Sequence, residues 1–417
     1  MLSSFVIVFF SVIAWALGRH LLFLFMIWFG HFWMALSSSY LESGVYITEQ
    51  NRESFANNAT LILLGLEACF WLSALVTIKA LRGTLPVGRK IRFSTSGNGL
   101  LCLFAGTALT MLLANLALTG SPLFDASITR FNFWENAKLP FLNQILGNVA
   151  APIIVMLGVS YALSVDSKRN LQAKAALIIF IGFLAYYVLI GHKFSMQLLA
   201  FSLFMPSVLF LRWQALGKLN ISVSHVVLAA SAGSLVLGLI SWHYLQKHVG
   251  FVEDQGGVLN AIIYRFLGLQ GHVWWGTITE HQQGYVVTDP LGAMLNGMEI
   301  SMYAVSPTQL VDRYLDSGVR FTMAYPGIVV LSLGLLGAAL VQLMVGVLVG
   351  WLVWICERQL AERRLLGSIM ALTLLSNFWL VLNMGDFSTL ISVKFIAPLV
   401  TLIFLVLIAS ATRRIDS

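Results

Sequence analysis

Five positively charged side chains give the first chemical signal in this 417-residue sequence. They stand in the more polar stretches between long apolar runs: Arg130, Lys193, Arg265, Arg313 and Arg320. Arginine offers a planar fork of donors that binds phosphate through two hydrogen bonds, and charge-assisted bonds are roughly twice as strong as neutral ones. As a set, the five indicate an anionic ligand. Any one of them is explained equally well as an anchor for lipid headgroups.

The segment Val258–Trp275 gives a second signal. It is apolar but too often interrupted by polar residues to span a membrane, so we predict a helix that lies at the membrane surface. Arg265 and His272 are seven residues apart and share a face if that helix is continuous. Gly268 and Gly271 weaken the prediction of continuity, because each costs about 1 kcal/mol relative to alanine.

Aromatic side chains accompany these cations. Trp274 and Trp275 follow His272 directly, and Trp134 follows Arg130 by four residues. The faces of sugar rings pack on aromatic rings, so this combination suits a lipid-linked phosphate that carries a sugar. A plain interfacial helix with a tryptophan belt explains Trp274 and Trp275 equally well.

Carboxylates could supply a catalytic base. Glu280 follows the tryptophan pair and is either a base or an ordinary loop residue. Glu67 lies inside an apolar run, where a charge costs about 3 kcal/mol on insertion scales, so it belongs to a functional site or bridges two helices. Arg313 and Asp316 have the spacing of a local ion pair. Arg320 has no such local partner and is the stronger functional candidate.

Several chemical signatures are missing from the sequence. It has no Walker motif, glycine-rich phosphate loop, His-Glu-x-x-His, Gly-x-Ser-x-Gly or Asp-x-Asp pair at an outer helix end. Cys69, Cys102 and Cys356 form no spaced pair, so neither a disulfide framework nor a zinc site is indicated. We expect no metal and no cofactor. ATP-driven transport, metalloprotease and serine hydrolase functions have no motif to support them.

The composition predicts the fold class. Charged residues make up 10% of the chain, against about 25% in soluble domains, and hydrophobic residues make up 58%. The apolar runs have the length of membrane-spanning helices, about 17–25 residues. The net charge of +7 falls mostly in short loops, where it signals topology rather than a nucleic-acid partner. We therefore predict an all-α polytopic membrane protein.

The apolar runs predict about eleven transmembrane helices in a single membrane domain over residues 1–417. The predicted spans are Leu2–Leu17, Leu21–Ser38, Thr60–Ile78, Gly99–Leu118, a fifth that ends at Ser164, a sixth that ends at Ile190, a seventh directly after it, an eighth that ends near Tyr244, Gly327–Trp351, and two final helices on either side of Asp386. Residues 245–326 form a long loop between the eighth and ninth spans, with short interfacial helices.

Lysine and arginine concentrate in alternate short loops, which predicts the orientation in the membrane. Cytoplasmic loops carry the excess of positive charge, so the N-terminus and the loop 245–326 lie outside and the C-terminus lies in the cytoplasm. The sequence has no internal repeat, so it gives no support to an inverted-repeat transporter.

Three stretches of the sequence resemble a known family. Gly120–Trp134, with the pattern Gly-x-Pro-Leu-Phe…Arg-Phe-x-Phe-Trp, is similar to the first outer loop of O-antigen (oligosaccharide repeat unit) polymerases of the Wzy type. The turn Gly191–Lys193 resembles the Gly-Ser/Lys-Arg/Lys turn of those proteins, although His192 and Lys193 stand where an arginine is common. An arginine before Gln-Gly-His-x-Trp-Trp in a long late outer loop also fits.

The resemblance implies a fold and a function. Such polymerases are GT-C-like glycosyltransferases at the periplasmic face of the bacterial inner membrane. They transfer a glycan from undecaprenyl diphosphate onto the sugar end of another lipid-linked repeat unit, in contact with membrane lipids and without a metal or a nucleotide sugar. The product is O-antigen, capsule or exopolysaccharide, and participation of a chain-length regulator protein stays open.

On this hypothesis, arginines stabilise the charge on the departing diphosphate and a base takes the proton of the acceptor hydroxyl. His272 is the first candidate for the base or for hydrogen bonding to the acceptor, and Glu280 is the second. The catalytic candidates are Arg130, Arg265, His272, Glu280 and Arg320. The substrate-binding candidates are Trp134, His192, Lys193, Trp274, Trp275 and Arg313.

Three other functions compete with this one. An O-antigen ligase shares the donor, the face and the architecture, but it uses lipid A core as acceptor. A flippase or other transporter of lipid-linked oligosaccharides should carry charges along a central cavity, whereas here they gather on one side of the membrane. A structural subunit without activity is disfavoured by the size of the outer loop and by its arginines.

Overall fold

The computed structural model describes residues 2–82, 96–125, 128, 132–191, 194–217, 238 and 258–415. The chain divides into two compact units, each of which is described by itself. The first unit comprises Met1–Leu85, Gln255–Ile355 and Leu374–Ser417, and the second comprises Pro86–Asp254 and Cys356–Thr373.

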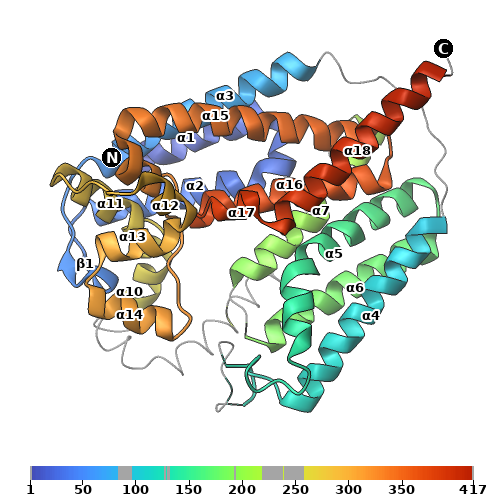
Figure 1. Ribbon diagram of the computed structural model, residues 1–417, viewed down its shortest axis with the longest axis horizontal. Coiled ribbons are helices and arrows are strands. Elements are labelled where there is room, and N and C mark those ends of the chain that lie inside the picture. Colours follow the sequence, from blue (N-terminus) through green and yellow to red (C-terminus); the bar gives the residue numbers. More distant parts are fainter. Residues whose placement is uncertain are drawn as a thin grey trace. The chain divides into compact units, whose positions relative to one another are not determined.

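Long apolar helices make up most of the first unit (Figure 1). They are α1 (Leu2–Leu17), α2 (Leu21–Leu41), α3 (Ala59–Arg82), all but the end of α15 (Gly327–Ala361), the second half of α16 (Leu365–Met384), the single turn α17 (Ser388–Ile391) and α18 (Val393–Ile415). The 3-10 turn η1 (Gly18–His20) separates α1 from α2. Gly346 and Gly350 let α15 approach α3, because a Cβ atom at either would lie within 3 Å of α3 backbone oxygens.

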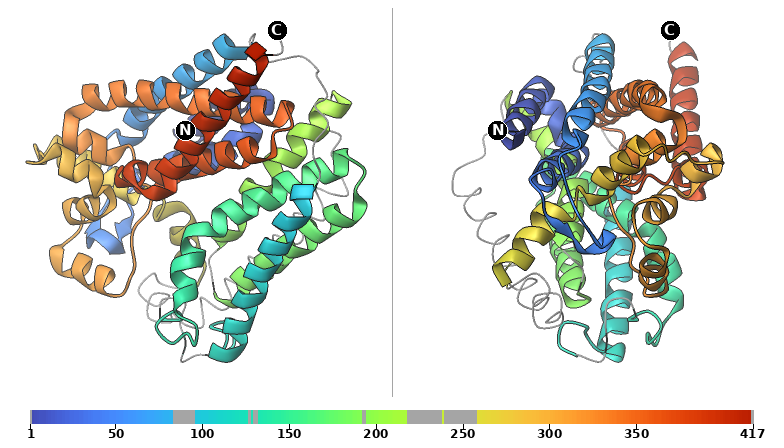
Figure 2. Two further views of the ribbon diagram at one scale, coloured as in Figure 1. Left: turned by 45° about the vertical axis from the view of Figure 1, so that its right-hand side comes forward. Right: turned by 90° about the vertical axis from the view of Figure 1, so that its left-hand side faces the viewer.

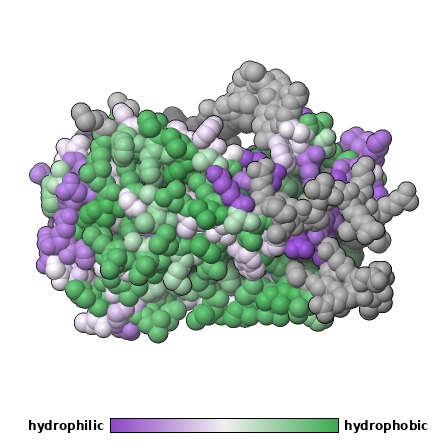
Figure 3. Space-filling model, turned by 90° about the horizontal axis from the view of Figure 1, so that it is seen from above, coloured by the Kyte–Doolittle hydropathy of each residue, from purple (hydrophilic) through white to green (hydrophobic). Residues whose placement is uncertain are grey.

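Apolar side chains of these helices face outward. Trp15, Leu336 and Val393 are 85%, 79% and 80% exposed, which would be unfavourable in water and is favourable in lipid. Apolar atoms also cover most of the described surface on the face shown in Figure 3. The helices therefore satisfy their own backbone hydrogen bonds and present side chains to hydrocarbon, as a membrane protein requires.

The second unit is a group of four helices packed along one another (Figures 1 and 2). They are α4 (Ser96–Thr119), α5 (Phe141–Asp166), α6 (Asn170–Leu189) and α7 (Phe194–Leu216). A Cβ atom at Gly158 of α5 would lie 2.4 Å from the Phe204 carbonyl oxygen of α7, so glycine permits this close packing. The Arg363 guanidinium binds Asp166 at 2.7 Å and ties the segment Cys356–Thr373 to the end of α5.

The structure confirms the predicted fold class, an all-α polytopic membrane protein. Among the described residues, seven helices are long and apolar enough to cross a membrane, and the continuous run Leu2–Leu41 counts as one of them. Shorter apolar helices at Ala150–Asp166 and Val393–Leu405 match the fifth and the last predicted spans. The predicted eighth span, which ends near Tyr244, lies outside the described residues.

Short elements form the part of the first unit that does not span. The segment after α2 folds into a small hairpin, β1 (Tyr46–Ile47) and β2 (Arg52–Glu53), around the turn η2 (Thr48–Gln50). The late loop contains α10 (Val258–Ile263), the π-helical turn η3 (Tyr264–Gly268), α11 (His272–Gln282), α12 (Pro290–Leu295), α13 (Gly297–Val305) and α14 (Thr308–Asp316). Short helices in this loop were predicted, and its described part confirms them.

The predicted continuous helix over Val258–Trp275 is wrong. The chain breaks after η3 and starts again at His272, so Arg265 and His272 do not share the face of one helix. The reason is a close approach to α2: a Cβ atom at Gly271 would lie 2.5 Å from the Ser38 backbone nitrogen.

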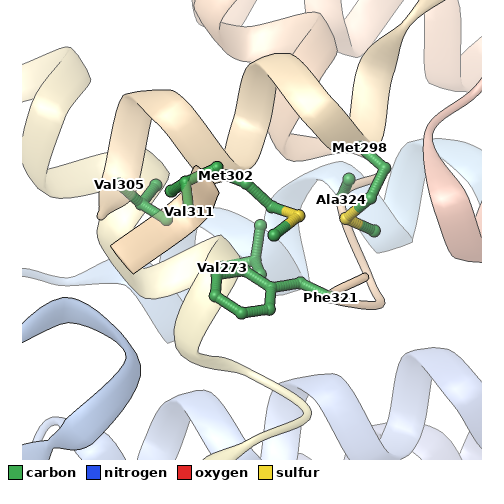
Figure 4. Packing of buried hydrophobic residues seen from close by; sticks show 7 residues of the cluster. All are labelled: Val273, Met298, Met302, Val305, Val311, Phe321 and Ala324. Carbon is green, nitrogen blue, oxygen red and sulfur yellow. The ribbon is translucent and has the colours of Figure 1, made fainter. Parts of the chain in front are cut away.

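A small hydrophobic core holds the late elements together (Figure 4). Val273 of α11, Met302 of α13 and Val311 of α14 are fully buried, and Phe321 from the segment before α15 joins them. The core therefore fixes α11 and the Phe321 segment relative to one another.

The close approach at Gly271 gives a stability prediction. Gly271→Ala should lower the free energy of unfolding by about 1–3 kcal/mol, because the added methyl group overlaps the α2 backbone. The measurement is the thermal unfolding midpoint of the detergent-solubilised protein.

Gly65→Ala in α3 is the matched control. An added methyl group at Gly65 meets nothing within 4 Å, and alanine is the better helix former by up to about 1 kcal/mol. Equal midpoints for the two variants would show that the Gly271 contact is dispensable.

Candidate functional site

The two tryptophans of α11 are buried and bonded to the segment that precedes α3. Trp274 and Trp275 are each 0% exposed. Their Nε1 atoms donate to the carbonyl oxygens of Ala59 at 2.8 Å and of Phe55 at 2.9 Å. The Arg52 guanidinium lies 5.1 Å from the centroid of the Trp275 ring. Neither indole offers an open face for a sugar, so in this structure both hold α11 in place.

Glu280 belongs to the same connection. Arg52 donates to the Glu280 carboxylate at 2.8 Å and to the Gln50 side chain at 3.0 Å. The Gln50 amide donates in turn to the His272 carbonyl oxygen at 2.7 Å. Because its carboxylate faces Arg52, Glu280 ties α11 to the hairpin, and we rank it below His272 as a candidate base.

A buried carboxylate organises the other side of this region. Glu49 is 7% exposed and accepts a short hydrogen bond from the Tyr264 hydroxyl of η3. Its charge also acts on Arg265, His272 and Tyr314. We call these five residues the Glu49 cluster. It brings together one anion, one cation, one imidazole and two phenols, contributed by η2, η3, α11 and α14.

Burial dominates the proton affinities in the Glu49 cluster. It lowers the pKa of Arg265, and the neighbouring Glu49 and Tyr314 oppose that shift. Burial likewise lowers the pKa of His272, while Glu49 and the Leu269 carbonyl oppose the shift. Burial and the Glu49 charge raise the pKa of Tyr264 well above its usual range. His272 is therefore a neutral imidazole near pH 7.

The neutral form of His272 has a defined orientation. Its Nδ1 lies 2.7 Å from the Leu269 carbonyl oxygen, which can only accept, so Nδ1 carries the proton. Nε2 is then an acceptor, and it is buried without a hydrogen-bond partner among the described residues. The Phe321 ring packs edge-on against the imidazole at 4.7 Å between centroids. Nε2 is thus the atom that could take a proton from a hydroxyl that enters the cluster.

Two further predicted cations lie on the surface of the late loop. Arg313 on α14 and Arg320 after it are both exposed. No ion pair joins Arg313 to Asp316 in the described structure, so the local ion-pair alternative is wrong. Arg320 directly precedes Phe321, the ring neighbour of His272.

The remaining predicted residues belong to the second unit. Arg130, His192 and Lys193 lie outside the described residues. Trp134 is half-buried, and its ring packs edge-on against Phe133 at 5.2 Å between centroids.

Sequence reasoning missed three members of the Glu49 cluster. They are Glu49, Tyr264 and Tyr314. The one available signal was the pair Tyr264-Arg265 in an otherwise apolar run. Over the described ranges, no group of three or more His, Cys, Asp or Glu side chains is placed to hold a metal ion.

Comparison with known proteins adds one match. A family model described as "Family of unknown function (DUF6418)" matches residues 293–399, which is less than half of the chain. No curated protein and no solved structure matches the chain. The matched stretch includes α13, α14 and the segment with Arg320 and Phe321, and its description carries no activity.

The burial of His272 predicts how stability depends on pH. The pKa of His272 is lowered in the folded state, so the unfolded chain binds this proton more readily. The stabilisation is complete above the ordinary histidine pKa of about 6.5 and is lost progressively as the pH falls from that value to the lowered pKa of the folded state. The unfolding midpoint of the wild type should therefore fall more steeply than that of His272→Gln between about pH 7.5 and 5.5. Parallel curves would contradict the burial of a neutral imidazole.

Proposed function

We propose that this protein is a membrane glycosyltransferase that polymerises oligosaccharide repeat units carried on undecaprenyl diphosphate. The observation that carries the proposal is the Glu49 cluster. It gathers the partly buried Arg265 guanidinium and the imidazole of His272, which has an unpartnered acceptor, around the charge of Glu49, in a part of the chain outside the spanning helices. The resemblance of the outer segments to Wzy-type polymerases supplies the substrate class.

The chemistry of the Glu49 cluster matches the needs of this reaction. The departing lipid diphosphate gains negative charge, and a fixed guanidinium in a site of low polarity stabilises such charge strongly. Arg265 is assigned this role, and Glu49 orients it. The acceptor hydroxyl loses a proton as the glycosidic bond forms, and His272 Nε2 is assigned to take it.

Exposed cations would attract the lipid-linked anions before they reach the cluster. Arg313 and Arg320 are assigned this role because both are solvent-facing and belong to the late loop. Arg130, His192 and Lys193 remain candidates on the resemblance alone. Trp274 and Trp275 are left out of the site because their rings are buried.

The finer architecture is part of the same proposal. It comprises a GT-C-like arrangement with eleven spans in the bacterial inner membrane, a periplasmic N-terminus and a cytoplasmic C-terminus. The active face is periplasmic, and the reaction needs neither a metal nor a nucleotide sugar. The basic short loops on the other side support this orientation, because the charge rule is counted over short loops.

Replacement of Arg265 tests the proposal in cells. A strain deleted for the gene should lose the polysaccharide ladder and keep single repeat units. Complementation with Arg265→Ala should reduce the amount of polymer by about a hundredfold or more, because one charge-stabilising donor is lost. The readout is a gel of lipopolysaccharide or capsule, together with the pool of lipid-linked repeat units.

Arg212→Ala is the matched control. Arg212 is an exposed arginine of α7 and is not a member of the Glu49 cluster, so this variant should restore the full ladder. Immunoblots confirm equal amounts of the variants in the membrane. A ladder that survives gene deletion would overturn the proposal. Polymer that accumulates on the lipid carrier without reaching lipid A core would identify a ligase instead.

A further inference from the structure

Two ionisable side chains meet inside the spanning helices of the first unit. His31 of α2 is 2% exposed and Glu67 of α3 is 0% exposed. His31 Nδ1 lies 2.8 Å from Glu67 Oε2. Both residues belong to helices long and apolar enough to cross a membrane, where an isolated charge costs several kcal/mol. The pair is separate from the Glu49 cluster, and the proposed glycosyl transfer does not use it.

Polar and aromatic groups surround the pair. Trp71 Nε1 donates to the same Glu67 oxygen at 2.8 Å. The His31 ring stacks on Tyr325 at 6.4 Å between centroids, and the Tyr325 hydroxyl donates to Gln342 at 2.7 Å. The side chains thus form one connected group from α2, α3 and α15 together with the segment that leads into it.

Three buried polar atoms in this group lack partners among the described residues. They are Glu67 Oε1, His31 Nε2 and Gln342 Nε2. A buried polar atom without a hydrogen-bond partner destabilises the folded protein, so a bridge that only joins two helices would not leave three such atoms together. Unused lone pairs on a carboxylate and an imidazole, both shielded from bulk water, are typical of a site where protons bind.

We propose that His31 and Glu67 form a proton-binding site within the membrane-spanning part of the protein. With one proton shared across the hydrogen bond, the pair is neutral, either as imidazolium and carboxylate or as imidazole and carboxylic acid. Loss of that proton to water leaves a neutral imidazole and a charged carboxylate, which the Trp71 N–H stabilises. Uptake of a proton from water restores the neutral pair.

Few other titratable groups face the His31–Glu67 pair in the described residues. Glu67 forms no ion pair with a lysine or arginine in the part of the chain that the structure describes. Helix α1 has no titratable side chain, and on α11 His272 responds to the charge of Glu49. Tyr325 is the titratable neighbour on the segment before α15.

A chain of packed side chains connects the His31–Glu67 pair to the Glu49 cluster. Tyr325 ends the segment that begins with Phe321, and Phe321 packs against His272. Ala324 of the same segment lies in the core of the late elements (Figure 4). Glu67 is thus connected to Tyr325 through the His31 ring, and Tyr325 is connected to His272 through the short segment that carries Phe321.

Fluorine NMR tests the site without any activity assay. The full-length protein is labelled with 5-fluorotryptophan, and the Trp71 signal is assigned by its absence in Trp71→Phe. Spectra are recorded from about pH 5 to about pH 9, the range in which proteins remain folded most often. Because Trp71 Nε1 binds the Glu67 carboxylate, the Trp71 signal should move in this series when the pair gains or loses its proton. The shift should vanish in Glu67→Gln and change its midpoint in His31→Gln.

Asp316→Asn is the matched control, because Asp316 is an exposed carboxylate on α14 and should leave the Trp71 titration unchanged. A Trp71 signal that stays fixed over the whole range in the wild type would overturn the proposal, even if the Glu67 variant does not fold. A titration that persists in a folded Glu67→Gln protein would overturn it as well.

Discussion

Hydrogen bonds between two short segments far apart in the sequence hold the candidate site together. The hairpin segment after α2 and the late elements η3 and α11 meet through Tyr264 and Glu49, and through the indoles of Trp274 and Trp275. Backbone carbonyls of one segment are satisfied by side chains of the other, as buried polar groups require. These bonds place the Glu49 carboxylate where its charge acts on Arg265, and they add to the packing of Gly271 on α2 that holds α11 against the spanning helices.

The need to neutralise buried charge explains where polar chemistry is found in this apolar chain. With 10% charged residues, the protein can place few ionisable groups in its interior. Two of these groups have specific partners: Glu49 accepts a hydrogen bond from Tyr264 and acts on Arg265, and Glu67 faces His31. Buried ionisable groups that face a specific charged neighbour are candidates for functional sites. On this ground we assign catalysis to the first cluster and proton binding to the second.

The sequence predicted the all-α membrane class correctly, because apolar runs of the right length leave few alternatives in lipid. Gly268 and Gly271 indicated that the helix predicted over Val258–Trp275 is not continuous, and the structure has its break there. The sequence did not predict the Glu49 cluster, because tertiary contacts bring its members together. Glu49 and Tyr264 are separated by 215 residues, and no local pattern links them. Trp274 and Trp275 were read as sugar contacts, since composition alone does not distinguish an exposed ring from a buried one. His31 was not recognised as the partner of Glu67 because 36 residues separate them and no local pattern links them.

Reconstitution tests the central claim most directly. The purified protein in liposomes is supplied with a defined repeat unit on undecaprenyl diphosphate and with no other enzyme. The account predicts chains of two or more repeat units on the lipid, with one undecaprenyl diphosphate released for each glycosidic bond formed. Release of lipid diphosphate without chain growth, or no reaction at all with a repeat unit that the source cell polymerises, would contradict it.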